Sequence, residues 1–315
     1  MLIETAQREY RTWILDSRRW RHYQPRPDDI VIATYPKCGT TWMQRIVGLL
    51  IFQTPEPMPI MQISAWLDRR FPQPIEAVIA YIEAQKHRRF LKSHLPLDGL
   101  PFFDEVKYIH VARDGRDACM SFHNHCMGFT DRMLENLNNA GMEDETIGRP
   151  YPRVPVDSCQ FFHHWITQGE VPGQTDGSPG VSFFQFENSW WAARSRPNVL
   201  NVHYNDLKAD LSAEMRRIAD FLDISVAPHL WPQLVAAADF EAMRRDGDTL
   251  LAHVAVTFKH GSRGFFFKGA NERWRGVATE ADLELYEAKA DSMFSPACAH
   301  WVSQGRSKAG DPALT

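Results

Sequence analysis

The segment Tyr35–Trp42, with the sequence YPKCGTTW, most constrains how this chain can fold. It follows the short apolar run 30–33 and precedes an apolar-periodic run over 43–52, an order typical of a strand, a tight turn and a helix. The amides of such a turn and the positive end of the helix dipole converge on one point, which Lys37 and two threonine hydroxyls can also reach. The segment therefore predicts a binding site for an anion such as a phosphate.

The order of residues in this loop differs from the Walker A pattern. GxxxxGK[ST] places a glycine before the lysine, whereas here Lys37 precedes Gly39. An ordinary strand-to-helix turn with an incidental lysine is an equally good interpretation of so short a motif, so the rest of the chain must decide between the two.

Composition places the chain among ordinary globular proteins. Its 315 residues are 44% hydrophobic and 23% charged, and the net charge of −4 gives no reason to expect a nucleic-acid partner. The five cysteines lack the spacing of a zinc site or a disulfide framework, and no apolar run is long enough to cross a membrane. The charged N-terminus does not look like a signal peptide. We therefore expect a soluble, cytoplasmic protein that binds a small anion in a cleft.

Strand, turn and helix alternate along the chain, which predicts an α/β fold with a central, mostly parallel sheet flanked by helices. We expect strands at 30–33, 89–93, 107–112 and 199–204, and helices at 43–52, 75–86, from about 115 through 122, 157–168, 187–194, 211–222, 230–238, 240–245 and 280–294. We also expect an amphipathic helix over 3–20, a mobile loop or short helices over 129–155, and a frayed tail over 303–315. The absence of a composition break favours a single domain over 1–315, with its core at about 20–295.

Five stretches, taken in chain order, resemble the cytosolic-type sulfotransferases, which use 3′-phosphoadenosine 5′-phosphosulfate (PAPS). That family writes the loop YPKSGTTW, and Cys38 stands here in place of the serine. The other matching stretches are Lys92–Pro96, Tyr108–Arg113 with Ser121, Ser189–Trp191 with 197–208, and Phe266–Gly269 with Trp274. Ordered co-occurrence is much harder to obtain by chance than any single motif. The resemblance covers about 20–280 and implies the sulfotransferase fold, which is similar to that of P-loop kinases.

The resemblance implies three catalytic residues. His94 would be the general base that takes the proton from the acceptor, because an imidazole titrates near neutrality and this one follows a predicted strand end. Lys37 would stabilise the phosphate that leaves, and Lys92 would be a second cation on the sulfate or phosphate. These two lysines would supply the positive charge that Mg²⁺ supplies in kinases, so we expect no metal requirement.

The resemblance also implies how the cofactor is held. Arg113 and Ser121 would bind its 3′-phosphate, and two aromatic rings would contact the adenine. An arginine of the family falls on Phe267, so either Lys268 with the Gly269 amide suffices or Arg263 folds over to replace it. The expected cofactor residues are Lys37, Cys38, Gly39, Thr40, Thr41, Trp42, Arg113, Ser121, Tyr204, Phe267, Lys268 and Gly269. Beside a phosphate loop, we expect the Cys38 thiol to have a lowered pKa and to be open to oxidation.

The acceptor site is predicted from bulky side chains in segments that cover this site in the family. Their size implies a small apolar, aromatic or lipid-like acceptor that carries a hydroxyl or an amine. The expected acceptor-site residues are Trp20, Trp66, Phe71, Phe122, His125 and Phe129. The dimerisation motif of the family has no clear copy, so the sequence leaves open whether the protein is a monomer or a homodimer.

Two other functions are compatible with an anion loop on a parallel sheet. A P-loop small-molecule kinase would show the Walker A order and an acidic Mg²⁺ partner, neither of which is found. A non-catalytic protein that binds PAPS or its product, adenosine 3′,5′-bisphosphate (PAP), would need the Arg113 and Ser121 pair but no base. The presence of His94 and Lys37 favours the enzyme.

Overall fold

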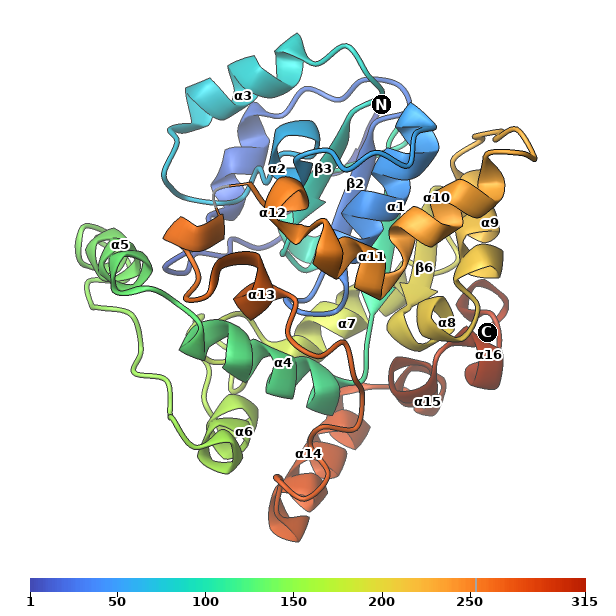
Figure 1. The fold of residues 1–315 in the computed structure, drawn as a ribbon. Coiled ribbons are helices and arrows are strands. Elements are labelled where there is room, and N and C mark those ends of the chain that lie inside the picture. The colour runs from blue at the N-terminus through green and yellow to red at the C-terminus, as the bar shows by residue number, and fades with distance from the viewer. Residues whose placement is uncertain (253) are drawn as a thin grey trace.

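The centre of the protein is a four-stranded parallel sheet, seen here in a computed structural model that describes residues 1–252 and 254–315. The strand order is β3-β2-β5-β6 (Figure 1). The bounds are Ile30–Thr34 for β2, Phe90–Ser93 for β3, Lys107–Ala112 for β5 and Val199–His203 for β6. Each of the four strands predicted from the sequence is confirmed to within one residue at either end.

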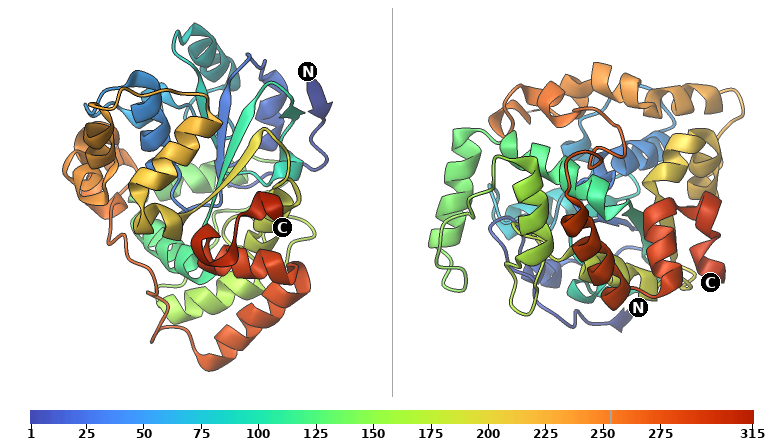
Figure 2. Two further views of the ribbon diagram at one scale, coloured as in Figure 1. Left: turned by 90° about the vertical axis from the view of Figure 1, so that its right-hand side faces the viewer. Right: turned by 90° about the horizontal axis from the view of Figure 1, so that it is seen from below.

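Side chains of β2 alternate between two hydrophobic clusters, one on each face of the sheet. Ile30 and Ile32 pack in one cluster with α1, α9 and α10, whereas Val31 and Ala33 pack in the other with α4, α6 and α7. A parallel strand that is buried on both faces must be apolar throughout, which explains the unbroken run Ile-Val-Ile-Ala. Figure 2 shows the strands between the two helical layers. The predicted α/β class is therefore confirmed.

The helical elements have the following bounds. They are η1 (Ser17–His22), α1 (Thr40–Phe52), α2 (Ile60–Ile63), α3 (Ile75–Ala84), η2 (Leu97–Gly99), α4 (Gly115–Met127), α5 (Asp131–Met142), α6 (Ser158–Thr167), α7 (Phe183–Ala192), α8 (Tyr204–Ala209), α9 (Leu211–Phe221), α10 (Trp231–Ala238), α11 (Phe240–Arg245), α12 (Gly247–Leu250), η3 (Val254–Val256), α13 (Gly261–Phe265), α14 (Glu280–Met293), α15 (Pro296–Gln304), α16 (Arg306–Ala309) and η4 (Pro312–Leu314). Across the part of the chain that the structure describes, none of these helices is long and apolar enough to cross a bilayer.

The predicted helix over 3–20 is wrong. Strand β1 (Leu2–Glu4) instead pairs antiparallel with β4 (Phe102–Phe103), and only the short helix η1 follows. The aromatic side chains that suggested the helix are held by different parts of the chain: Tyr10 Oη donates to Asp98 at 2.8 Å, and Trp13 Nε1 donates to the Arg149 carbonyl at 3.0 Å. Tertiary contacts therefore override the helical spacing in this segment.

The segment 129–155 contains a longer helix than we expected. Helix α5 has 12 residues, and the Thr130 hydroxyl accepts from the Met133 amide at its start. Its buried apolar side includes Met133 and Leu137, which pack against the core. The mainly polar composition of the segment conceals this narrow apolar side, so the expectation of a loop or short helices is wrong here.

The expectation of a frayed tail is also wrong. Arg306 and Ser307 donate their amides to the Asp206 carboxylate at 2.7 and 3.0 Å, and the Arg306 guanidinium pairs with Glu214 at 2.7 Å. Asp206 and Glu214 are buried on α8 and α9, beside the C-terminal helices in Figure 1. The chain at Arg306 and Ser307 is therefore held against α8 and α9.

Candidate active site

Four predicted site residues lie at one edge of the sheet because each follows the carboxyl end of a different parallel strand. Lys37 follows β2, His94 follows β3, Arg113 follows β5 and Tyr204 follows β6. All four line one cavity of about 1040 Å³. Ligands of open parallel sheets bind at this edge. The cavity is large enough to hold a nucleotide and a second molecule together.

The loop between β2 and α1 has a backbone that only certain residues can adopt. Gly39 has a φ of 110°, and a Cβ atom there would lie 3.3 Å from the Tyr204 ring. Lys37 also has a positive φ of 73°. Helix α1 begins at Thr40, and the Thr40 hydroxyl lies 2.5 Å from that of Thr34. Because Thr40 lines the cavity, the N-terminus of α1 opens on it. The loop therefore has the glycine-dependent backbone and the helix N-terminus facing the cavity that an anion site needs, and anion binding stays a prediction.

Two lysines enter the cavity, and neither makes an ion pair with a carboxylate of the described residues. Lys37 Nζ lies 3.4 Å from His125 Nδ1, and Lys92 Nζ lies 3.8 Å from the centre of the Trp66 ring. Burial, followed by the nearby Arg113 charge, lowers the pKa of Lys37 to about 8. Burial, followed by the nearby Arg69 charge, lowers the pKa of Lys92 to about 7. An anion in the cavity would favour the charged form of both.

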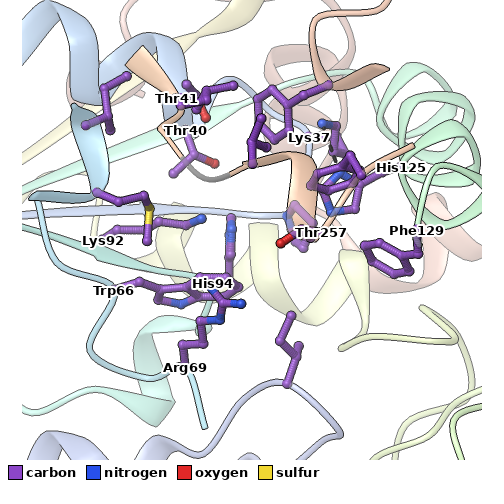
Figure 3. Close-up of a pocket in the computed structure, with 18 of the residues that line it drawn as sticks. Lys37, Thr40, Thr41, Trp66, Arg69, Lys92, His94, His125, Phe129 and Thr257 are labelled. Carbon is purple, nitrogen blue, oxygen red and sulfur yellow. Dashed lines mark hydrogen bonds between the residues drawn. The ribbon is translucent and has the colours of Figure 1, made fainter. Parts of the chain in front are cut away.

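The imidazole of His94 is held in one tautomer. Its Nδ1 lies 2.7 Å from the Thr34 carbonyl oxygen, which can only accept, so Nδ1 carries the proton and Nε2 has a free lone pair. The Trp66 ring stands perpendicular to the imidazole at 5.0 Å. Burial, followed by the Lys92 charge, lowers the pKa of His94 well below its usual range. His94 is therefore a neutral proton acceptor, beside Trp66 in Figure 3.

Arg113 connects the loop between β2 and α1, called the anion loop below, to the chain that follows α13. Its guanidinium donates to the Lys37 carbonyl at 3.1 Å, to the Ala270 carbonyl at 3.1 Å and to Asn271 Oδ1 at 2.9 Å. The Arg113 Nε is buried and has no hydrogen-bond partner within residues 1–252 and 254–315, and the guanidinium carbon lies 4.2 Å from the Tyr204 ring centre. The remaining predicted cofactor residues on this side of the cavity are Ser121, Trp42, Phe267, Lys268 and Gly269.

The structure shows which of the positively charged side chains near Phe267 in the sequence line the cavity. Lys268 lines the cavity, whereas Arg263 is exposed and is not part of the lining. Arg273, which the sequence reading passed over, lines the cavity with its guanidinium carbon 4.9 Å from the Phe267 ring. Burial and the neighbouring Arg113 charge both lower the pKa of Arg273. Its position directly before Trp274, which belongs to a stretch that resembles the family, was the signal in the sequence that could have identified Arg273 as a site residue.

Two predicted site residues do not reach the cavity. Trp20 is only 3% exposed, and its indole donates to Asp68 at 3.1 Å behind the cavity wall. Cys38 is fully buried in the core, and its amide donates to the Tyr35 carbonyl at 3.2 Å. Burial raises the pKa of the Cys38 thiol well above its usual range. The expected lowering of this pKa, and with it the oxidation-prone thiolate, is therefore wrong.

The other five residues predicted for the acceptor site do line the cavity. They are Trp66, Phe71, Phe122, His125 and Phe129. Figure 3 shows His125, Phe129 and Thr257 across the cavity from His94 and Trp66. Residues that the sequence reading missed extend this apolar wall: Trp13, Met133, Leu137 and Tyr151. The end of the cavity beyond His94 is thus suited to a ligand with a large apolar part.

Comparisons with known proteins agree with this geometry. A glycolipid sulfotransferase of Mycobacterium bovis is 33% identical over 324 residues, which covers 96% of this chain and 96% of that protein. Two crystal structures with PAP have a similar fold: retinol dehydratase with androsterone and PAP (TM-score 0.67, 20% identity, covering 89% of this chain and 84% of that chain) and a mouse sulfotransferase (TM-score 0.66, 19% identity, covering 90% of each chain). The sulfotransferase domain model matches residues 27–294. The chain therefore belongs to the sulfotransferase family.

Proposed function

We propose that this enzyme transfers the sulfuryl group of PAPS to a hydroxyl of a lipid-like acceptor. The observation that carries the proposal is the position of the free His94 Nε2 in the same cavity as a pair of lysines without carboxylate partners. PAP in the related crystal structures supports the cofactor class. The apolar wall beyond His94 and the glycolipid acceptor named for the mycobacterial relative support a lipid-like acceptor.

The residues of the cavity fit the two phosphate-bearing ends of such a cofactor. Arg113, Ser121, Lys268 and Arg273 would hold the 3′-phosphate, because three of them are cations and all four line the cavity. The amides of the anion loop and the hydroxyls of Thr40 and Thr41 would hold the 5′-phosphate. Trp42 and Tyr204, whose ring centres lie 5.4 Å apart, would contact the adenine.

The chemistry assigned to the protein is proton removal and charge stabilisation. PAPS, when bound, supplies the sulfuryl group and leaves as PAP. His94 Nε2 would take the acceptor hydroxyl proton while the hydrogen bond from Nδ1 to Thr34 holds the ring in place. Lys37 would offset the negative charge that grows on the departing phosphate oxygen, and Lys92 would offset charge on the sulfuryl oxygens. With two cations so placed, we propose that no metal is required.

The cellular location of the enzyme and its organisation as one domain are also proposals. All five cysteines are unpaired in the structure, as expected of a protein in a reducing compartment, which supports a cytoplasmic location. The two hydrophobic clusters lie on opposite faces of one sheet, which supports a single domain over the whole chain.

The first test is thermal unfolding with PAP and, separately, with ATP. A ligand that binds only the folded protein raises the unfolding midpoint, so at 100 times its Kd PAP should add about 2.7 kcal/mol to the free energy of unfolding. ATP, which lacks a 3′-phosphate, should add much less. Transfer of radiolabelled sulfate from PAPS to alkyl glycosides would then confirm the activity. A midpoint that rises with ATP alone would instead indicate a kinase.

The affinity for PAP should fall as the pH rises above about 8. Lys37 has a pKa of about 8 in the free enzyme, and a bound phosphate raises that pKa, so binding is accompanied by proton uptake. Affinity is then highest below pH 8 and weakens by up to about tenfold per pH unit above it. Calorimetry from pH 7 to 9.5, in buffers of different ionisation enthalpy, would detect both the loss and the proton uptake. A constant Kd over this range would contradict a role for Lys37 in binding.

A further inference from the structure

Arg69 is a cation inside the acceptor side of the cavity. It lies in the chain between α2 and α3, where a backbone bridge to Leu15 holds it in place. Its guanidinium carbon lies 5.5 Å from the Trp66 ring centre and 5.6 Å from the Phe71 ring centre. Figure 3 shows its side chain below Trp66 and near His94. The charge of Arg69 therefore lies among aromatic rings, next to the proposed base.

No acceptor among the described residues receives a hydrogen bond from the Arg69 side chain, and its Nε is buried without a partner. The neighbouring Arg70 provides a contrast, since it donates to the carbonyls of Thr12 and Ala140 and pairs with Asp144 at 2.7 Å. Placing a guanidinium in apolar surroundings without a partner costs free energy. The fold thus provides hydrogen-bond partners for the Arg70 side chain, whereas the Arg69 side chain faces the cavity.

The carboxylate next to Arg69 in the sequence, that of Asp68, makes no ion pair with it among the described residues. Asp68 accepts from the indoles of Trp20 and Trp66 at 3.1 and 2.9 Å and from the His94 amide at 3.2 Å. Its oxygens are thus used by groups in the wall of the cavity. The nearby side chain of Lys92 adds a second positive charge, which repels that of Arg69. This part of the cavity holds an excess of positive charge.

The proposed cofactor phosphates bind elsewhere. Lys37 and Arg113 lie at the loop between β2 and α1, whereas Trp66 lies between Lys92 and Arg69 in Figure 3. Arg69 is therefore placed on the acceptor side of Trp66, near the apolar wall that includes Phe71. An acceptor molecule that fills this wall would bring its own groups within reach of the guanidinium.

We propose that Arg69 binds an anionic group of the acceptor, a carboxylate or a phosphate ester, close to the hydroxyl that His94 deprotonates. The inference rests on the proposed function and narrows the acceptor to an acidic amphiphile. An anion is favoured over a neutral sugar hydroxyl because only an anion also balances the charge of Arg69, whereas Lys92 faces the proposed sulfuryl group. The planar guanidinium can donate two parallel hydrogen bonds to either kind of oxyanion.

The test compares acceptors that share an alkyl chain, a sugar ring and the hydroxyls at C2, C3 and C4, and that differ at C6. They are octyl 6-deoxy-β-glucoside, which is the neutral glucoside of the series, octyl β-glucuronide and octyl glucoside 6-phosphate. For the wild-type enzyme we expect kcat/KM to be at least about tenfold higher for one of the two acids than for the glucoside, as a charge-assisted hydrogen bond provides. The better acid identifies the anion as carboxylate or phosphate. A wild-type preference for the glucoside would overturn the proposal.

The variants Arg69→Gln and Arg69→Lys test whether Arg69 causes this preference. In Arg69→Gln the ratio of kcat/KM for acid over glucoside should fall to near one, and in Arg69→Lys part of it should return. Arg132→Gln is the matched control, because Arg132 lines the same cavity from α5 but is exposed, and it should keep the ratio. An Arg69→Gln enzyme that loses both activities equally would contradict the proposal and would assign Arg69 to the transfer step or to the fold.

A binding measurement separates this inference from the proposed function. Calorimetry of the three octyl glycosides with the PAP complex requires no turnover, and Arg69→Gln should weaken only the binding of the acid. If PAP does not bind the wild-type protein, the proposed function itself is lost. If PAP binds and the glycosides are sulfated, but Arg69→Gln leaves the ratio as it is, only the role of Arg69 is wrong.

Discussion

Replacement of His94 by asparagine is expected to lower kcat by about 10²- to 10⁴-fold, the usual contribution of a positioned general base. The asparagine amide can still donate to the Thr34 carbonyl that now accepts from Nδ1, so the buried hydrogen bond is largely kept. Nothing then replaces the lone pair of Nε2. Initial rates at saturating PAPS and acceptor measure the loss, and the affinity for PAP should change by less than about threefold.

The matched control for this change is His123→Asn, two residues before His125 on α4. His123 Nε2 lies 3.0 Å from the Pro155 carbonyl and is not part of the cavity lining, so this variant should keep most of the activity. The division of the loss between kcat and KM provides a second criterion. A loss that falls on KM, with kcat nearly unchanged, would show that His94 positions the substrate and is not the base.

Replacement of Lys37 by methionine is expected to lower kcat by about 10²- to 10³-fold, as the loss of one donor to a developing charge does. Methionine keeps the length of the side chain beside the Phe265 ring, which lies 4.4 Å from the Lys37 ammonium, and removes only the charge. Because negative charge grows on the departing oxygen between bound PAPS and the transition state, kcat should fall by more than the affinity for PAPS does.

Lys107→Met controls for the general loss of a positive charge. Lys107 belongs to the same sheet but lies at the start of β5, where it pairs with Asp223 at 3.2 Å, far along the strand from the cavity. This variant should retain nearly full activity. If Lys37→Met weakened PAP binding as much as it lowered kcat/KM, with kcat unchanged, Lys37 would contribute to binding and not to the transfer step.

The residues that sequence reasoning located correctly depend on local order along the chain. His94 and Arg113 each follow a buried strand directly, and parallel strands bring such positions together whatever the loops do. Local order does not predict the direction in which a side chain of a loop points, and the Cys38 side chain points into the core. Trp20 was misplaced for a similar reason, because its segment approaches the cavity while its indole turns to Asp68.

Other parts of the site could not be predicted because they depend on contacts between distant segments. Arg69 and Arg70 are adjacent and chemically identical, and only the approach of Asp144 from the end of α5 decides which one is paired. Arg273 reaches the cavity through the path of the chain after α13, whereas with Trp274 matched to the family the missing arginine falls on Phe267, beside Lys268. Similarly, the aromatic spacing near the N-terminus predicted a helix, since the separate partners of Tyr10 and Trp13 are distant in sequence.

The C-terminal tail has a structural role that follows from its attachment to α8. That helix begins with Tyr204, which lines the cavity and is proposed to contact the adenine, and two residues later Asp206 accepts both tail amides. Removal of the tail would leave a buried carboxylate without these donors, two residues from Tyr204. We therefore expect residues 306–307 and the wall of the cavity formed by α8 to belong to one cooperative folding unit, and the two should gain and lose protection from hydrogen exchange together.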